Sequence, residues 1–155
     1  MWKTSIQTHE GCCSPKLKTK AQCPKCHVEA KGVLAKTLQA LLKEEAKGKI
    51  QSFEGWHFCR SATCEVIYFK ETSVLKQHDV SIDVGCKVWA SPAMVCYCFD
   101  WSKEKIKAEL KREGKSTAQA NIKAKMAGEG CSCEVLNPSG GCCLADVGKL
   151  VKEYT

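Results

Sequence analysis

Short apolar runs separated by polar residues characterise residues 21–90. Leucines that follow Thr37 at helical spacing predict a short helix with Thr37 as its N-cap. Compact or alternating apolar runs are typical of β-strands, so strands are expected after this helix. The runs concerned are 56–58, 66–69 and 80–84. This part of the chain is therefore predicted to be rich in β-structure.

The pattern changes to helical spacing over residues 91–155. Ser102 is expected to cap a helix that ends at Gly114. Ser116 or Thr117 is expected to begin a second helix. A third helix is predicted at the end of the chain, where one apolar stripe would face the core. Its members are Leu144, Val147, Leu150, Val151 and Tyr154.

These two patterns predict an α+β protein in which a small β-rich unit precedes a helical unit. The expected divisions are a polar, lysine-rich tail over 1–20, a first domain over 21–90 and a second domain over 91–155. The proline-containing segment 90–93 is the expected hinge between the two domains.

The composition excludes several classes of protein. Hydrophobic residues make up 44% of the chain and charged residues 26%, which indicates a folded protein and not a disordered one. The apolar runs are far shorter than the ~20 residues that span a bilayer, so no membrane insertion is expected. The first residues lack the apolar core of a signal peptide. We therefore expect a cytoplasmic protein.

The formal net charge of +7 raises the question of nucleic-acid binding. Arg60 and Arg112 are the two arginines among the 24 basic residues, whereas base and phosphate recognition favour arginine, so nucleic acid is not expected as a partner. Basic residues are most concentrated over 103–125, where eight of them accompany three glutamates. This stretch is either a solvated helical face or a docking surface for an acidic partner.

Cysteine is the most informative residue type. The chain has 13 cysteines in 155 residues, and an odd number cannot pair completely in disulfides within one chain. So high a content indicates either a disulfide scaffold or metal sites. Because no export signal leads to an oxidising compartment, we expect the thiols to bind metal. The sequence contains no Ser/His/Asp arrangement and no nucleotide-binding glycine motif, so no enzyme is expected.

A first set of cysteines occurs as two close pairs. Cys23 and Cys26 form a C-x2-C motif, and Cys59 and Cys64 form a C-x4-C motif between two predicted strands. Together they supply four soft anionic ligands, which a structural zinc ion binds in tetrahedral geometry. A site of this kind is closed, so its expected role is stability and not catalysis.

Two alternatives to this zinc site follow from neighbouring histidines. Residues 23–27 also match the C-x-x-C-H pattern of c-type haem attachment. Haem attachment normally follows export, and it would leave the C-x4-C pair unexplained, so we reject it. His27 or His57 could also replace one cysteine as a zinc ligand.

A second set of cysteines lies in the helical unit. Cys96 and Cys98 form a C-x-C motif, which strains a single tetrahedral ion but suits the iron of a 2Fe–2S cluster. Further cysteines lie near the end of the chain: Cys131, Cys133, Cys142 and Cys143. The last two precede the final helix, whose N-terminus favours thiolates. A second zinc site is the alternative.

These motifs carry a resemblance to known families. The C-x-C motif within 94–98, followed by two short helices and a late cysteine cluster, resembles the bacterioferritin-associated ferredoxin (BFD-like) 2Fe–2S fold. The Asn-Pro-Ser-Gly-Gly-Cys-Cys stretch at 137–143 resembles the cluster loop of that family. The motifs at 23–26 and 58–69 look like the zinc-binding domain that precedes it in CopZ-type copper chaperones. The resemblance covers residues 21–155.

The resemblance implies ligands for both metals. The implied zinc ligands are Cys23, Cys26, Cys59 and Cys64. The implied ligands of the 2Fe–2S cluster are Cys96, Cys98, Cys133 and Cys143. Cys133 is preferred to Cys131 because it stands four residues before Asn137, as the third ligand of the family does. The choice between Cys142 and Cys143 stays open.

The function implied is copper or heavy-metal handling, in which the cluster supplies an electron for the reduction of Cu(II) to Cu(I). The implied partner is a metal-transport or redox protein such as a copper-transporting ATPase. One alternative is a one-electron carrier that docks a reductase or a ferritin-like protein through the lysine-rich stretch. Another is a zinc-stabilised interaction module without redox chemistry.

Three cysteines outside these sets, and one missing motif, complete the expectations. The copper domain of the family has an M-x-C-x-x-C loop, and this sequence contains none, so delivery of copper by such a loop is not expected. Cys12 and Cys13 in the tail are candidate ligands for Cu(I) or another soft ion. Cys86 is expected to be a small buried apolar residue.

Overall fold

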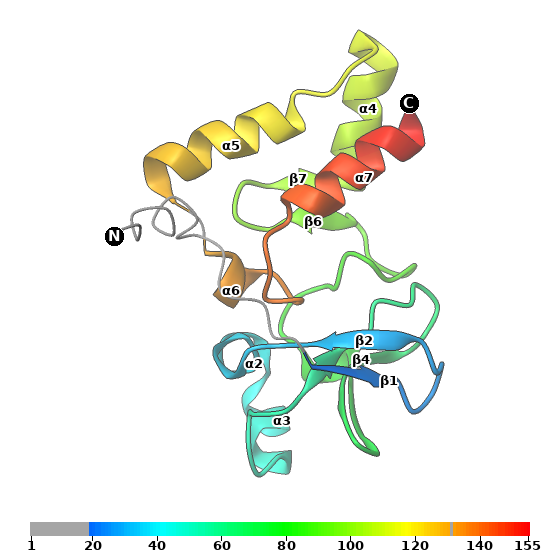
Figure 1. Ribbon diagram of the computed structural model, residues 1–155, viewed down its shortest axis with the longest axis vertical. Helices are drawn as coiled ribbons and strands as arrows, with labels where there is room; N and C mark the ends of the chain where they lie inside the picture. The colour runs from blue at the N-terminus through cyan, green and yellow to red at the C-terminus, as the bar shows by residue number, and fades with distance from the viewer. Residues whose placement is uncertain (1–18, 131) are drawn as a thin grey trace, which may run out of the picture.

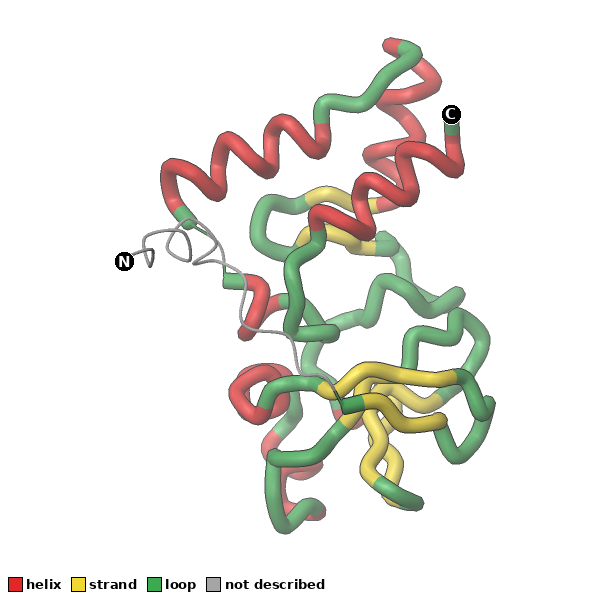
Figure 2. The backbone as a smooth tube through the Cα atoms, viewed as in Figure 1, coloured by secondary structure: helices red, strands yellow, loops and turns green. Residues whose placement is uncertain are grey.

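Residues 19–130 and 132–155 are described by a computed structural model of the protein. Two units lie one above the other, a sheet with two short helices and a group of longer helices, with helix α6 (Cys133–Leu136) between them (Figures 1 and 2). Most of the predicted tail lies outside the described residues, including Cys12 and Cys13, and so does Cys131.

The first unit is a five-stranded antiparallel sheet in which each strand pairs with its neighbours in the sequence. Its strands are β1 (Lys20–Gln22), β2 (Glu29–Gly32), β3 (His57–Phe58), β4 (Val66–Lys70) and β5 (Ser73–Lys76). Helices α2 (Ala35–Leu41) and α3 (Glu44–Lys49) are inserted between β2 and β3. The strands predicted at 56–58 and 66–69 are thus confirmed.

Strand β4 is buried on both faces and separates two clusters of apolar side chains. Ile67 and Tyr68 pack with the leucines of α2, whereas Val66 and Phe69 pack against the cysteines of the first set. The pairing of β4 with β5 is irregular between Val66 and Tyr68, and such a bulge changes the direction of the side chains that follow. The sheet can therefore serve a hydrophobic core and a cysteine cluster at once.

Thr37 does not cap the helix that follows it. Helix α2 begins two residues earlier, after Leu34, and Thr37 lies inside it. Its side chain is completely buried, and its hydroxyl donates to the backbone carbonyl of Glu134 in the second unit. A hydroxyl can cap a helix or bind a distant carbonyl, and here the packing of α2 against α6 decides in favour of the carbonyl.

The strand predicted over 80–84 is wrong, apart from a single β-bridge between Val80 and Leu42. Val80 and Val84 are buried as their alternation suggested. However, the side chain of Gln77 replaces a neighbouring strand, because it donates to the carbonyl of Ile82 and accepts from the N–H of Val84. These backbone groups are therefore satisfied without a sheet ladder.

The predicted helices of the second unit are confirmed as α4 (Lys103–Glu113), α5 (Ala118–Glu129) and α7 (Leu144–Tyr154). The hydroxyl of Ser102 caps α4 by accepting from the N–H of Lys105 at 3.1 Å. Gly114 ends this helix in the left-handed conformation, which a residue without a side chain adopts at little cost. Helix α5 begins after Thr117.

The second unit also contains a hairpin that the helical pattern did not predict. Strands β6 (Met94–Cys96) and β7 (Trp101–Ser102) pair antiparallel. Both are too short to give a recognisable alternation, and Asp100 in the turn has a positive φ of 61°. The C-x-C motif therefore lies in a hairpin that precedes the helices of this unit.

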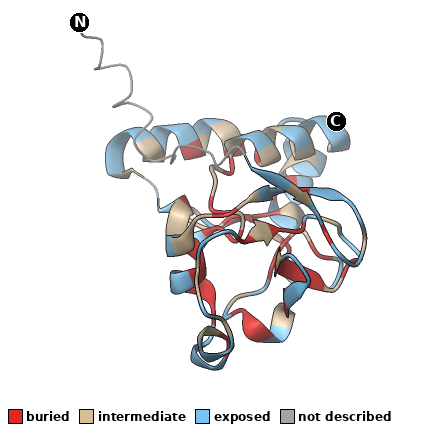
Figure 3. Cartoon of the chain, turned by 60° about the horizontal axis from the view of Figure 1, so that its bottom comes forward, coloured by how far each residue is buried: buried red, intermediate tan, exposed pale blue. Residues whose placement is uncertain are grey.

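The buried residues lie mainly between the sheet and the elements packed on it, and the outer faces of the helices are exposed (Figure 3). The second unit has its own core around Ile106, Ile122 and Val147. Within residues 19–130 and 132–155, no helix is both long and apolar enough to cross a membrane.

Candidate metal centres

The cysteines of the first set form a compact cage. The sulfur atoms of Cys23, Cys26, Cys59 and Cys64 all lie within 4.8 Å of one another. The sulfurs of Cys23 and Cys64 are 3.9 Å apart, and those of Cys26 and Cys59 are 3.6 Å apart. A tetrahedral zinc ion with Zn–S bonds of about 2.3 Å requires sulfurs about 3.8 Å apart. The cage therefore has the size that zinc needs.

Two turns of the sheet position these ligands. Cys23 and Cys26 lie in the turn between β1 and β2, where the N–H of His27 donates to the carbonyl of Cys23 at 2.8 Å. His27 has a φ of 63°, so the chain reverses directly after the C-x2-C motif. Cys59 and Cys64 lie in the turn between β3 and β4. Because both turns lie on one antiparallel sheet, the backbone brings the two pairs together.

Neither neighbouring histidine belongs to this cage. Among the described residues the compact group consists of the four cysteines. His27 is exposed, and His57 stacks on Phe69 with ring centroids 5.5 Å apart. Burial lowers the pKa of His57, so this side chain is neutral at pH 7. The geometry favours the four-thiol set over the sets that include a histidine.

A buried lysine lies beside the cage. Lys87 is 2% exposed, and its ammonium group donates to the carbonyl of Ser61, inside the C-x4-C turn, at 2.7 Å. The next residue, Val88, donates its N–H to the carbonyl of Ala62 at 2.9 Å. A zinc ion with four thiolates carries a net charge of −2, so a buried cation at this place offsets part of that charge.

The electrostatics of the cage differ from one thiol to another. Burial raises the pKa of Cys59 to about 12, although the N–H of Ser61 and the charge of Lys87 oppose this shift. Burial also acts on Cys26, but hydrogen bonds from the backbone at Val28 and from neighbouring thiols lower its pKa to about 7. At least one thiol of the cage therefore ionises readily, which favours metal binding because a metal ion must displace the protons of its thiol ligands.

The cysteines of the second set come from two separate segments. Cys96 ends β6 and Cys98 lies in the hairpin turn, whereas Cys133 begins α6 and Cys143 directly precedes α7. The sulfurs of Cys98 and Cys133 are 3.6 Å apart. The thiol of Cys143 interacts with those of Cys133 and Cys96, which lower the pKa of Cys143 to about 4. The structure thus brings all four predicted residues together.

This second arrangement is less compact than the first. Apart from the first cage, no set of described cysteines, histidines and acids forms a group of that kind. Cys96, Cys133 and Cys143 are buried, whereas Cys98 is half-buried. A hydrogen bond from the thiol of Cys133 lowers the pKa of Cys98 to about 7, and the N–H of Ser132 donates to its sulfur at 3.2 Å. The sequence did not predict this hydrogen bond, because nothing in it places the N–H of Ser132 near Cys98.

The structure separates Cys143 from its neighbour Cys142. Cys143 is 1% exposed and belongs to the core of the second unit, where its thiol contacts two of the other three cysteines. Cys142 is half-buried and interacts with Cys133. Cys86, which was expected to be buried, is half-buried and packs against the core of the first unit, and burial raises its pKa.

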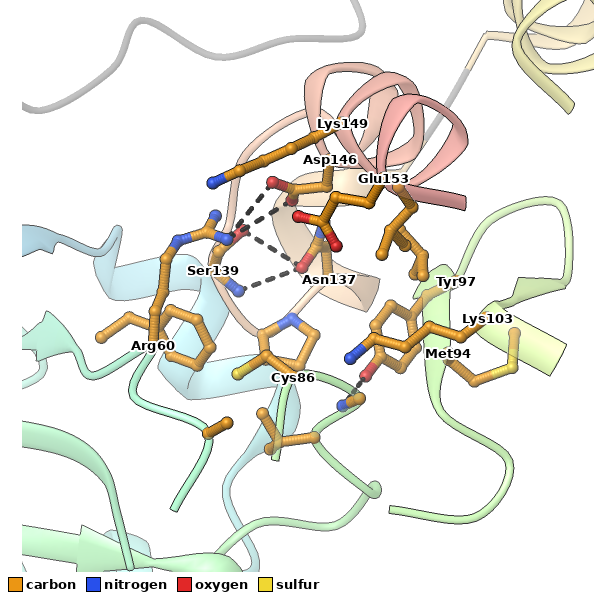
Figure 4. Close-up of a pocket in the computed structure, with 17 residues that line it drawn as sticks. Arg60, Cys86, Met94, Tyr97, Lys103, Asn137, Ser139, Asp146, Lys149 and Glu153 are labelled. Carbon is orange, nitrogen blue, oxygen red and sulfur yellow. Dashed lines mark hydrogen bonds and ion pairs between the residues drawn. The ribbon is translucent and has the colours of Figure 1, made fainter. Parts of the chain in front are cut away.

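A cleft of ≈ 430 Å³ separates the two units on one side (Figure 4). Arg60, from the C-x4-C turn, and Asp146, from the first turn of α7, form an ion pair of 3.4 Å across it. A second hollow of ≈ 340 Å³ shares these two residues and has Cys142 in its wall. Sequence reasoning missed these contacts, since no pattern relates residues 86 positions apart.

The fold and the first cage define a cysteine-rich, zinc-binding domain that is joined to a helical unit with a second group of thiols. Residues 20–81 match the family of the CopZ-type zinc binding domain. This match covers the sheet and both short helices, including all four cysteines of the cage.

Two comparisons extend this relationship into the second unit. Over 122 residues the chain is 35% identical to the copper chaperone CopZ of Archaeoglobus fulgidus, an alignment that covers 79% of this chain and 57% of the chaperone. The X-ray structure of the N-terminal domain of A. fulgidus CopZ superimposes with a TM-score of 0.70 at 35% identity, covering 84% of this chain and 97% of the solved one. The chain belongs to the family of CopZ N-terminal domains.

Proposed function

We propose that this protein binds zinc in the first cage and a 2Fe–2S cluster at the second group of cysteines, and that it handles copper. The proposed zinc ligands are Cys23, Cys26, Cys59 and Cys64. The proposed cluster ligands are Cys96, Cys98, Cys133 and Cys143. The observation that carries the proposal is that four thiols form one compact cage in the first set, whereas among the described residues the thiols of the second set form no such cage and contact one another in pairs, Cys98 with Cys133 and Cys143 with Cys133 and Cys96.

The spread of the second set favours a cluster over a second zinc ion. A 2Fe–2S cluster has two irons, so its four thiolates need not surround a single point. The two ligands of the C-x-C motif are only two residues apart, which strains a tetrahedral ion. Three of the four sulfurs are buried, and the N–H of Ser132 points at the fourth, an arrangement that suits a cluster whose sulfurs accept hydrogen bonds.

A cluster held there would supply one-electron chemistry, in which one iron passes from Fe(II) to Fe(III) while one Cu(II) becomes Cu(I). This electron would leave through Cys98, which is the least buried of the four ligands, and its half-buried neighbour Phe99. Copper itself is proposed as the substrate because the relative is a copper chaperone. The Cu(I) produced would pass to a metal-transport partner such as a copper-transporting ATPase.

Anaerobic purification tests this proposal. We expect a coloured protein with one zinc, two irons and two sulfides per chain. Reduced protein titrated with Cu(II) should return to the spectrum of the oxidised cluster as one equivalent of Cu(I) appears on a Cu(I)-specific chelator. A colourless protein without sulfide contradicts the cluster, and a cluster that Cu(II) does not oxidise contradicts the copper reaction.

A second candidate function, that of a one-electron carrier, is favoured by the lysines around the hairpin turn. Lys105 lies over the ring of Trp101 at 4.8 Å, and Lys125 lies over the ring of Phe99 at 5.7 Å. Both lysines are exposed and flank the turn that contains Cys98. They form no ion pair with any described residue. Cation–π contacts of this kind hold the two charges in place beside the least buried ligand.

The glutamates of the same stretch form no ion pair with these two lysines and are bound to other partners. Glu104 accepts from the N–H of Ala93, and Glu113 pairs with Arg112. Glu109 accepts from the residues that begin α5. Over 103–125 the basic residues outnumber the glutamates, and although the turn itself contains the exposed Asp100, this side of the unit suits a redox partner with an acidic face.

Charge reversal distinguishes the carrier from the copper reductase. Lys105→Glu and Lys125→Glu should slow reduction of the cluster by a ferredoxin reductase with NADPH and weaken the salt dependence of that rate. Lys43→Glu, an exposed lysine of the first unit, is the matched control. If all three variants are reduced at the wild-type rate, the lysines around Cys98 do not dock an electron donor.

A further inference from the structure

Both segments that carry the second group of cysteines are attached to the first unit by side-chain hydrogen bonds. The residues between Cys133 and Cys143 include one short helix, α6, and a loop. The hairpin of Cys96 and Cys98 is equally short. Segments this short have little stability of their own, so their positions depend on what they pack against.

The loop between Cys133 and Cys143 is held at two backbone carbonyls. The hydroxyl of Thr37, on α2, donates to the carbonyl of Glu134, and the hydroxyl of Tyr68, on β4, donates to that of Pro138. Both donors are completely buried. A Cβ atom on Gly140 would lie 2.7 Å from the Thr37 hydroxyl, so α2 and the loop are in direct contact.

Two ion pairs flank these buried bonds at the surface. Lys36 pairs with Glu134 at 2.7 Å, directly beside the Thr37 bond. Arg60 pairs with Asp146 at 3.4 Å, in the first turn of the helix that follows Cys143. Every one of these contacts joins the first unit to the stretch 134–146.

The hairpin is attached in the same way. Tyr97 stands between Cys96 and Cys98, and its hydroxyl accepts from the N–H of Gly85 at 2.7 Å and donates to the carbonyl of Asp83 at 2.8 Å. These two residues follow the sheet of the first unit. The side chain between the two cysteines of the C-x-C motif is thus bound to a segment that the first unit places.

The zinc cage is connected to Tyr68 through the sheet. Cys59 donates its N–H to the carbonyl of Ile67 at 2.9 Å, and the residue before it, Phe58, is paired with Tyr68 across β3 and β4. The position of the Tyr68 hydroxyl therefore follows from the closure of the C-x4-C turn. A metal ion in the cage holds that turn closed.

We propose that the zinc-binding unit is the template on which the second metal centre is assembled, with Tyr68, Thr37 and Tyr97 as positioning residues for its ligands. The identity of the second centre as a 2Fe–2S cluster rests on the proposed function. The dependence of the loop on zinc does not. Zinc in this protein thus has a second role besides stabilising its own domain, since it sets the geometry of the neighbouring centre.

The first arm of the test uses single-atom changes. Tyr68→Phe and Thr37→Val remove one hydroxyl each, and both leave a buried carbonyl without its donor. We expect zinc content to be unchanged, the visible circular dichroism of the cluster to change, and iron loss to a chelator to be roughly tenfold faster. Thr37→Ser keeps a hydroxyl and should restore the slow rate. Tyr154→Phe is the matched control, because the Tyr154 hydroxyl makes no hydrogen bond with the described residues.

The second arm needs no cluster and therefore separates this inference from the proposed function. Hydrogen exchange is measured on the full-length, iron-free protein with and without zinc. Removal of zinc should abolish protection over 134–141 while helices α4 and α5 stay protected. If the loop stays protected without zinc, or if Tyr68→Phe and Thr37→Val behave like Tyr154→Phe, the template role is refuted. A protein that shows this exchange pattern but binds no iron contradicts the cluster and supports the template.

Discussion

The two cysteine centres differ in what holds their ligands. In the first, both pairs lie in turns of one antiparallel sheet, and the hydrogen bonds that hold those turns come from the first unit, including those from Lys87 and Val88 to the C-x4-C turn. In the second, a hairpin and a loop must meet between two units. The first centre is therefore held by contacts within its own unit, whereas the segments of the second centre also depend on contacts with the other unit.

The two centres also differ in how closely their four sulfur atoms approach one another. The four sulfurs of the cage surround one point at distances that suit a single ion. The second group has a close pair in Cys98 and Cys133, but as a whole it is less compact. One fold can therefore arrange the same type of side chain in two different ways, because backbone geometry sets the separation of the thiols.

The largest effect is expected when a ligand is removed from the four-cysteine cage of the first unit. Cys59→Ser removes a buried ligand, and we expect loss of zinc and unfolding of the sheet, since the binding energy of a structural zinc ion is folding energy. Zinc content and thermal unfolding measure this. Cys86→Ser is the control, a half-buried cysteine outside the cage, and it should keep zinc. A Cys59→Ser protein that retained stoichiometric zinc would refute the cage.

Next in size is the loss of the second centre alone. Cys143→Ser removes a thiol that contacts both Cys133 and Cys96, so we expect the visible absorption of the cluster to disappear while zinc content stays at one per chain. Cys142→Ser should retain the cluster. The reverse pattern would make Cys142 the ligand. Loss of zinc in Cys143→Ser would mean that the zinc cage also depends on the second centre.

A smaller effect is expected from the buried cation beside the cage. Lys87→Met removes a charge and the bond to the Ser61 carbonyl, at a cost of about 1–3 kcal/mol. Zinc transfer to a chelator should be faster by roughly a factor of ten. Lys25→Met is the matched control: Lys25 lies between Cys23 and Cys26 in the sequence, but its side chain is exposed and pairs with Glu65 at the surface. Equal transfer rates in the two variants would show that burial of the charge is irrelevant.

The smallest effect concerns the helical unit itself. Ser102→Ala removes the N-cap of α4 and should cost about 1 kcal/mol of stability. Hydrogen exchange should become faster in α4, with zinc content and protection of the sheet unchanged. Faster exchange in the sheet as well would show that the two units unfold together, which would weaken the distinction drawn between them. Ser73→Ala, on the exposed edge strand β5, is the control.

Sequence reasoning succeeded where ligands and structure are local. Residues 23–26 and 59–64 were recognised as pairs because their spacing lets both thiols reach one ion, and the sheet then joined the pairs as expected. Helices α4, α5 and α7 were also predicted from the sequence, since their end signals and apolar stripes are patterns of residues a few positions apart.

The two wrong predictions, at Thr37 and over 80–84, involve competition between local and distant partners. Thr37 could cap a helix or bind a distant carbonyl, and residues 80–84 could join a strand or be satisfied by Gln77. Local spacing cannot decide between such partners, because their free energies differ by little and depend on packing. The hairpin around the C-x-C motif was missed because its strands are too short to show a period.

By itself, the sequence determined that this is a thiol-rich metal-binding protein with two sets of closely spaced cysteines, since residue type and spacing are properties of the chain. Tertiary structure decided how those sets differ. It closed four thiols into one compact cage, brought the others together in pairwise contacts, and attached their segments to the first unit through Thr37, Tyr68 and Tyr97. The reason is that hydrogen bonds between units join residues tens of positions apart, and only the folded chain brings them within reach.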